Sequence, residues 1–323
     1  MIRALSHRLH HRSATLLLSL ETRLDRILMV WLLGAGLVSA LRIALAPVAH
    51  GPVEIGAMLP YVLLTLAPFV TTLLALRWFG KGDNMAQPAT RLAIVGRWRE
   101  VGPAEARRHP LYGTSGIMVS LLVGMMINVP IRALEYIAVM PPVPSSAPHW
   151  LLTLRFAMTL DVVLLSSLYM VAFVAALRKV PLFPRLLAAI WMVDLAMQLG
   201  IAQMVGREAL PAGVGESLGN LLTGNMKKVL ISVGVWLPYL LLSKRVNLTY
   251  RSRVPAEPLR ASESRWRLTA SWPESTAGSP RMRCFIATFC IDPGRLTSAT
   301  CSGVRTKLAE MCHSHRRRIH SYV

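Results

Sequence analysis

Six apolar stretches, each near the length needed to cross a lipid bilayer, limit what this chain can fold into. A helix of about 20 residues spans the ~30 Å hydrocarbon core of a membrane. Because lipid offers no hydrogen-bond partners, the backbone of each stretch must bond to itself, which favours helices. We therefore predict an all-α fold, a polytopic transmembrane helical bundle. The six predicted spans are residues 27–47, 58–76, 112–131, 151–177, 186–205 and 229–243.

The composition supports a membrane protein, and the position of the charges argues against a nucleic-acid partner. Of 323 residues, 53% are hydrophobic and only 16% are charged, whereas soluble domains are about 25% charged. The net charge is +20, but half of it lies from Lys244 onward, and most other basic residues flank the apolar stretches. Nucleic-acid recognition needs a folded basic face. We therefore predict the lipid bilayer as a partner and no nucleic acid.

The basic residues are unevenly divided between alternate connections of the predicted spans. Fifteen lie before the first span, between the second and third, and between the fourth and fifth, against about four in the other connections. Cytoplasmic connections carry the excess of Lys and Arg. The pattern predicts a multi-pass inner-membrane protein with both termini cytoplasmic. Residues 1–26 then form a cytoplasmic basic N-terminus, and their length argues against a cleaved signal peptide.

The connection between the second and third spans has apolar residues at a helical spacing. Leu92, Val95, Trp98 and Val101 recur about every three residues among basic side chains. Two interpretations stay open, namely an amphipathic helix lying on anionic lipids of the cytoplasmic face and an ordinary solvated loop. Residues 27–110 are thus predicted to hold two transmembrane helices and this cytoplasmic loop.

Residues 251–323 are predicted to form a disordered, basic cytoplasmic tail. Ser, Thr, Pro and Arg dominate this part of the chain, and it has no helical or strand periodicity. All four cysteines lie here, separated by five, ten and ten residues. That spacing lacks a close Cys-x-x-Cys pair, so we predict no metal site and no cofactor. The abrupt change of composition leaves open whether the tail has a function.

Two short motifs give the chain its one resemblance to a known family. The first motif is Leu-Phe-Pro-Arg-Leu-Leu at residues 182–187. The second has two parts, Trp-Leu-Pro-Tyr at residues 236–239 and Ser-Lys-Arg-Val-Asn-Leu-Thr-Tyr at residues 243–250. These motifs resemble the YdgK-like family of bacterial membrane proteins, which has no known function. The resemblance covers about residues 111–250 and implies a four-helix inner-membrane domain. The residues that carry it are Phe183, Pro184, Arg185, Trp236, Pro238, Tyr239, Ser243, Lys244 and Arg245.

The start of that region departs from the family pattern. Family members open with a Gly-x-Gly-Gly-Trp-Leu-like run, whereas residues 113–118 of this chain read Gly-Thr-Ser-Gly-Ile-Met. The resemblance is therefore more specific at the end of the region than at its start. Pro238 is expected to kink the last span, Trp236 and Tyr239 to lie at the membrane interface, and Lys244 and Arg245 to anchor that end in the cytoplasm.

Two carboxylates lie within the predicted spans, where a charge costs about 2.5–3.5 kcal/mol and needs a reason. Asp161 and Asp194 fall near mid-membrane in neighbouring antiparallel helices, and Gln198 shares a helical face with Asp194. One interpretation is a proton- or cation-linked transport site. The other is hydrogen bonding between helices, to Ser166, Ser167, Gln198 or an arginine, that holds the bundle together.

Three arginines are expected at similar depth toward the outer surface of the membrane, in three different helices. Arg42, Arg132 and Arg155 could form a cationic pocket for a small anion or a lipid headgroup. The alternative is that each arginine extends toward the interface and that Arg132 pairs with Glu135, three residues further along the same helix.

No catalytic motif is visible in the sequence. It has no phosphate-binding glycine loop, no His-Glu-x-x-His and no Gly-x-Ser-x-Gly. We therefore predict no catalytic residues and a non-enzymatic membrane component that is structural or binds a partner, either another membrane protein or a second copy of itself. The alternative is a small proton- or cation-linked transporter or channel that uses Asp161 and Asp194.

Overall fold

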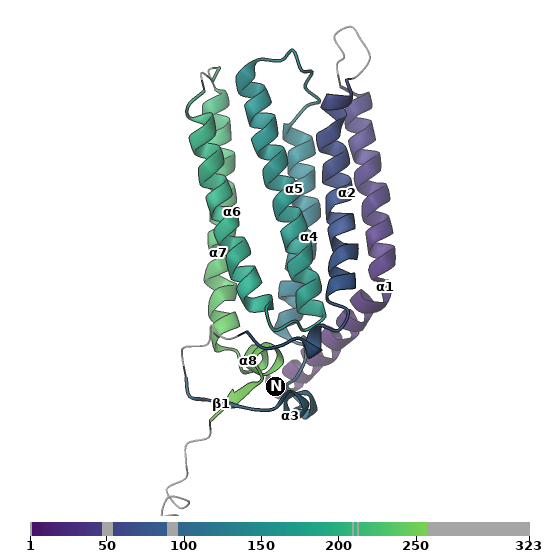
Figure 1. The fold of residues 1–323 in the computed structure, drawn as a ribbon, viewed down its shortest axis with the longest axis vertical. Helices are drawn as coiled ribbons and strands as arrows, with labels where there is room; N and C mark the ends of the chain where they lie inside the picture. The colour runs from purple at the N-terminus through teal and green to yellow at the C-terminus, as the bar shows by residue number, and fades with distance from the viewer. Residues whose placement is uncertain (1, 47–53, 89–95, 209, 212, 257–323) are drawn as a thin grey trace, which may run out of the picture. The chain divides into compact units, whose positions relative to one another are not determined.

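Six long helices make up most of the structure (Figure 1). The structure is a computed structural model that describes residues 2–46, 54–88, 96–208, 210–211 and 213–256. Each long helix contains a stretch long and apolar enough to cross a membrane. The predicted all-α, polytopic class is therefore confirmed, and the six candidate spans indicate a multi-pass membrane protein. The helices are α1 (Ile2–Ala44), α2 (Ile55–Trp78), α4 (Ile117–Val139), α5 (His149–Leu177), α6 (Phe183–Val205) and α7 (Val214–Leu242).

Short elements gather at one end of the bundle, where α1 begins and α7 ends (Figure 1). The two strands form an antiparallel pair in which Arg99 is opposite Val254. The strand pair joins the connection after α2 to the chain that follows α7. The short elements are the 3-10 helix η1 (Gly82–Asn84), β1 (Trp98–Glu100), α3 (Pro103–Arg108), α8 (Lys244–Arg251) and β2 (Arg253–Pro255).

α5 is the central helix of the bundle. It packs against α2, α4 and α6, while α1 packs on α2 and α4, and α7 packs on α6 and α8. In the most apolar part of α5, 67% of the residues are buried, compared with 11% in both α1 and α7. The outer faces of α1 and α7 are therefore the main surfaces available to lipid.

The buried apolar side chains form two separate clusters. The cluster nearer α8 includes Phe173, Phe183 and Tyr250, and the other includes Tyr136 and Ile201. Along α4, α5 and α6, buried polar residues lie at the point where one cluster gives way to the other. This polar layer is the feature of the core that ordinary packing does not require.

Three of the helices begin five or more residues away from the predicted start of their span. α1 begins at Ile2 and its apolar stretch at Thr15, whereas the first span was predicted from residue 27. α7 begins at Val214, fifteen residues before the predicted start, because Asn220, Asn225, Lys227 and Lys228 interrupt the apolar run without ending the helix. α4 covers Ile117–Val139 where residues 112–131 were predicted. Its N-cap, Gly116, has φ +79°, which lies outside the helical region, so the helix cannot extend further toward the N-terminus.

The interfacial helix, one of the two interpretations of the connection after the second span, does not extend over Trp98–Glu100, and the start of the tail also differs from the prediction. Trp98–Glu100 is a strand, and Leu92 and Val95, the first two apolar positions of that pattern, lie outside the described residues. The chain does not lose its structure at residue 251, because Arg253–Pro255 pairs with β1. The left-handed conformation of Ser252 (φ +48°) redirects the chain between α8 and β2. The predicted disorder of residues 257–323 lies outside the described residues.

Candidate functional site

An arginine joins two aspartates inside the bundle. Arg132 on α4 donates from Nη1 to Oδ2 of Asp161 on α5, at 3.2 Å. Its Nη2 donates to both carboxylate oxygens of Asp194 on α6, at 2.7 and 2.5 Å. One guanidinium therefore links three helices.

Each aspartate has a further hydrogen-bond donor. The Tyr169 hydroxyl donates to Oδ2 of Asp194 at 3.0 Å, and Nε2 of Gln198 donates to Oδ1 of Asp161 at 3.1 Å. The ring centroid of Tyr169 also lies 5.9 Å from the guanidinium carbon of Arg132, within cation–π range. We call these five residues the ion cluster. All five are buried, and Asp194 has no exposed surface.

Helix geometry explains why these side chains meet. Asp194 and Gln198 are four residues apart on α6, and Asp161 and Tyr169 are eight apart on α5, so each pair shares a face. The short turn at residues 178–182 makes α5 and α6 antiparallel neighbours, which places Asp161 and Asp194 at similar depth. The structure thus brings Asp161, Asp194 and Gln198 into one cluster.

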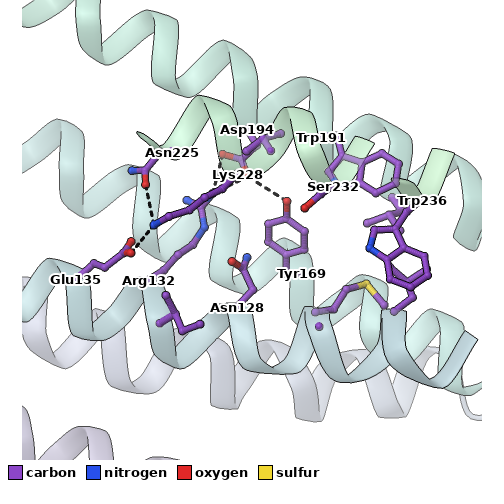
Figure 2. A pocket seen from close by; sticks show the side chains of 16 residues that line it. Asn128, Arg132, Glu135, Tyr169, Trp191, Asp194, Asn225, Lys228, Ser232 and Trp236 are labelled. Atoms are coloured by element: carbon purple, nitrogen blue, oxygen red, sulfur yellow. Dashed lines mark hydrogen bonds and ion pairs between the residues drawn. The ribbon is translucent and has the colours of Figure 1, made fainter. Parts of the chain in front are cut away.

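A cavity of about 150 Å³ lies beside the ion cluster, between α4, α5, α6 and α7 (Figure 2). Arg132, Tyr169 and Asp194 form part of its wall. Trp191 and Trp236 line one end, while the charged and amide side chains lie toward the other (Figure 2). The cavity has room for several water molecules, and its polar lining would hydrate them. The remaining polar lining residues are Asn128, Glu135, Asn225, Lys228 and Ser232.

An ion pair joins α4 to α7 at this cavity. Lys228 donates to Oε1 of Glu135 at 2.5 Å and also contacts the amide oxygen of Asn225 at 3.4 Å (Figure 2). Glu135 therefore pairs with Lys228 in place of the expected Arg132. The Lys228 side chain is 60% exposed and that of Glu135 is 38% exposed.

A second, smaller cavity also borders Arg132. It has a volume of about 20 Å³, enough for one water molecule. Arg132 and Asp161 line it, together with Glu135, Tyr136 and Asn225. Arg132, Glu135 and Asn225 line both cavities, so the ion cluster adjoins two small polar spaces within the bundle.

The contacts of Arg42 and Arg155 are made outside the ion cluster. Nη1 of Arg155 donates to the carbonyl oxygen of Val143 at 2.6 Å. Arg42 and Arg155 both lie within electrostatic reach of the Tyr61 hydroxyl, which donates to the carbonyl of Met140 at 2.7 Å. Of the three arginines expected together, Arg132 is the one whose contacts are with the aspartates.

The two family-like motifs meet at the α8 end of the bundle. The rings of Phe183 and Tyr250 are 5.0 Å apart, and the Tyr250 hydroxyl donates to the carbonyl of Ala176 at 2.9 Å. Arg245 donates to the Ser115 hydroxyl at 2.7 Å. These contacts attach α8 to α5, to α6 and to the segment before α4, so the motifs have a structural role in this chain.

The remaining motif residues lie close to helix ends. Ser243 is both the C-cap of α7 and the N-cap of α8. Trp236 and Tyr239 contact each other at 6.0 Å between ring centroids, on either side of Pro238 inside α7. Pro184 is buried in the first turn of α6, followed by Arg185, and Lys244 is exposed at the first position of α8.

Two members of the ion cluster were not assigned to it from the sequence. Arg132 was placed near the surface because the third span was expected to end at residue 131, whereas α4 continues to Val139. Tyr169 was overlooked, although its position eight residues after Asp161 was a usable signal. Ser167, one of the expected partners, donates to the carbonyl of Val163 on its own helix at 2.7 Å.

Comparisons with known proteins add no assignment to this geometry. Within the described residues, no group of three or more His, Cys, Asp or Glu side chains could hold a metal ion. The resemblance to the YdgK-like family stays a prediction, because the chain matches no family model, no curated protein and no solved structure.

Proposed function

We propose that the protein is a small proton- or cation-linked transporter whose ion cluster binds the coupling ion. The observation that carries the proposal is the position of Arg132 and Asp194 in the wall of the 150 Å³ cavity. Ionisable residues inside a membrane typically face a water-filled cavity when they serve an ion pathway. Arg132, Tyr169 and Asp194 line such a cavity, so the surroundings of the cluster are not apolar throughout.

The charge of the cluster favours a cationic ligand. With both carboxylates ionised, two negative groups share the single positive charge of Arg132, which leaves a net charge of −1. A net charge in a low-dielectric environment is costly. Binding one proton or one monovalent cation would neutralise it, and release to the cavity would restore it.

Stability alone is a weaker reason for keeping such a cluster. Replacing a buried ion network by apolar side chains of similar volume is often neutral or stabilising in proteins. A chain that only needed helices α4, α5 and α6 to pack could do so with the Leu, Val and Phe side chains that surround the cluster. The charges are therefore better explained by a ligand than by packing.

The membrane placement is part of the proposal. The excess of basic residues in segments 2–26, 79–116 and 178–182 supports a cytoplasmic location for the end where α1 begins and α8 lies. The resemblance of residues 111–250 to the YdgK-like family supports a bacterial inner membrane. No covalent chemistry is involved, so the proposed protein is not an enzyme.

A second candidate is a non-enzymatic structural or partner-binding membrane component. It is favoured by the pairing of both aspartates, because each one contacts both Arg132 and an uncharged donor from a second residue. Such pairing would suit an interhelical link. The outward apolar side chains of α7, among them Leu230, Ile231 and Val235, would then contact lipid or another membrane protein.

Flux measurements in proteoliposomes separate the two candidates. The purified chain is reconstituted, and proton, Na⁺ and K⁺ fluxes are followed with entrapped fluorescent indicators under imposed gradients. A transporter gives a flux that Asp161→Asn and Asp194→Asn abolish. Glu216→Gln is the matched control, because Glu216 is an exposed carboxylate in the first turn of α7.

The amide variants also control for folding. Asn can still accept a hydrogen bond from Arg132, so both variants should keep their helical content and remain monodisperse in detergent. If the wild-type chain carries none of the three ions, the transporter proposal is wrong and the structural candidate remains. If the flux survives in both Asn variants, the ion cluster is not the coupling site.

A further inference from the structure

A third cavity, of about 300 Å³, lies at the α8 end of the bundle and outside the ion cluster. Its wall comes from four separate parts of the chain, namely the segment after α2, the segment from α3 to Tyr112, the α5–α6 turn and α8 with the residue after it. We call it the α8-end cavity. Its polar lining includes Asp83, Gln87, Arg107, Tyr112, Lys179 and Ser252.

Two cations from different elements line this cavity, and they differ in their partners. Arg107 contacts Asp83 at 3.6 Å and also bonds the side-chain oxygen of Asn84. The Lys179 ammonium lies 5.4 Å from the ring centroid of Tyr112. Among the described residues, Lys179 has no carboxylate partner. Arg107 is thus held in place, while Lys179 keeps its hydrogen-bond donors available to a ligand.

The backbone at the cavity is in an unusual conformation at two positions. Lys179 has φ +56° and Ser252 has φ +48°, and these are the two non-glycine residues with positive φ in the described chain. Left-handed backbone commonly ends a helix, and Lys179 follows the C-cap of α5 while Ser252 is the C-cap of α8. Both residues line the α8-end cavity, so two helix ends shape this part of its wall.

The neutral polar groups complete the set of donors and acceptors. Burial raises the pKa of Tyr112, and the nearby Asp83 adds to this effect, so its hydroxyl stays protonated and can donate. The side-chain amide oxygen of Gln87 is buried and has no hydrogen-bond partner. Such an unsatisfied acceptor indicates a missing donor. A ligand with anionic oxygens and a hydroxyl or amine donor would satisfy all of these groups.

We propose that the α8-end cavity binds the phosphate group of a small phosphoester, with Lys179 as its main charge partner. Two cations against one carboxylate leave the lining with a net charge of +1. The ammonium of a lysine is a common phosphate ligand, and the hydroxyls of Tyr112 and Ser252 supply neutral donors. Both a phospholipid headgroup and a soluble phosphoester present this chemistry.

Three probes distinguish the sources of the phosphate group. The purified full chain in detergent is titrated with glycerol phosphate, with short-chain phosphatidylglycerol and with the matching short-chain diacylglycerol, and binding is followed by calorimetry. Tighter binding of the lipid than of glycerol phosphate by tenfold or more assigns a headgroup site, and comparable binding assigns a soluble ligand. Diacylglycerol that binds as well as the phosphate compounds would overturn the proposal.

Substitution of Lys179 tests the role of its charge. Lys179→Asn removes the ammonium but tolerates the left-handed backbone, whereas Lys179→Arg keeps a positive charge at the same position. We expect the dissociation constant to rise by about tenfold or more in the Asn variant and to change by less than about threefold in the Arg variant. Thermal unfolding of both unliganded variants should match the wild type. Unchanged phosphate binding in Lys179→Asn, or no binding of either phosphate compound to the wild type, would show the proposal to be wrong.

Discussion

Replacing Arg132 by methionine should destabilise the bundle strongly. Methionine fills most of the space of the arginine side chain but provides neither its charge nor its donors. Asp161 and Asp194 would then be left buried, at 3% and 0% exposure, without a cation. Removing one partner of a buried ion pair costs about 3–5 kcal/mol. For a chain of this size each kcal/mol lowers the melting temperature by about 2–4 °C, so we expect a decrease of about 6–20 °C.

Two further substitutions in the Arg132→Met variant test why its stability falls. In Arg132→Met/Asp161→Asn/Asp194→Asn, the stranded carboxylates become neutral amides that can bond to Tyr169, Gln198 and each other. We expect most of the lost melting temperature to return. The measurement is thermal unfolding of the detergent-solubilised protein, followed by circular dichroism. A triple variant no more stable than Arg132→Met would refute the claim that uncompensated charge causes the loss.

Two further predictions concern contacts away from the ion cluster. A Cβ at Gly82 would lie 2.6 Å from a backbone carbonyl oxygen at the end of α5, so Gly82→Ala should lower stability by about 1–3 kcal/mol. Gly80→Ala, with its nearest atom at 3.6 Å, is the control, and equal melting temperatures would contradict the close approach. The Ser145 amide donates to Glu54 at 2.9 Å, which lowers the pKa of Glu54 below its usual 4.5. Because the folded-state pKa is depressed, this contact stabilises the protein above about pH 4.5 and is lost as the pH falls through the folded value. Hydrogen exchange at Ser145 should therefore differ between the wild type and Glu54→Gln near pH 6 and converge near pH 3, and the same difference at both values would count against it.

The transmembrane helices were predictable because their signal is local. Apolar length alone locates a span, and α2, α5 and α6 lie within three residues of the predicted bounds at each end. The signal fails where polar residues are tolerated inside a helix. The first half of α7 was missed for this reason. Its polar residues Asn225 and Lys228 line the cavity, and Lys228 also pairs with Glu135 on α4.

The ion cluster was half predictable from sequence. Asp161 and Asp194 follow from counting residues on either side of a short turn, a constraint that helix geometry imposes. The partner Arg132 depends on the exact register of α4, and an error of eight residues at the end of that helix moved it from mid-membrane to the surface. The strand pair depends on contacts between residues more than 150 positions apart, such as Glu100 with Arg253, for which local patterns carry no information.

The strengths of these contacts suggest how the ion cluster is reached. Arg132 joins α4, α5 and α6 through bonds between buried charges, and parting them would leave charges uncompensated in the core. α7 instead packs on α6 and α8, and its polar link to α4 is the Lys228–Glu135 pair. Exposed ion pairs of this kind contribute only about 0–1 kcal/mol. Separation of α7 from α4 would therefore cost less than separation of α4, α5 and α6, and it would widen the cavity beside Asp194. If the proposed transport function is correct, the coupling ion would enter and leave between α4 and α7.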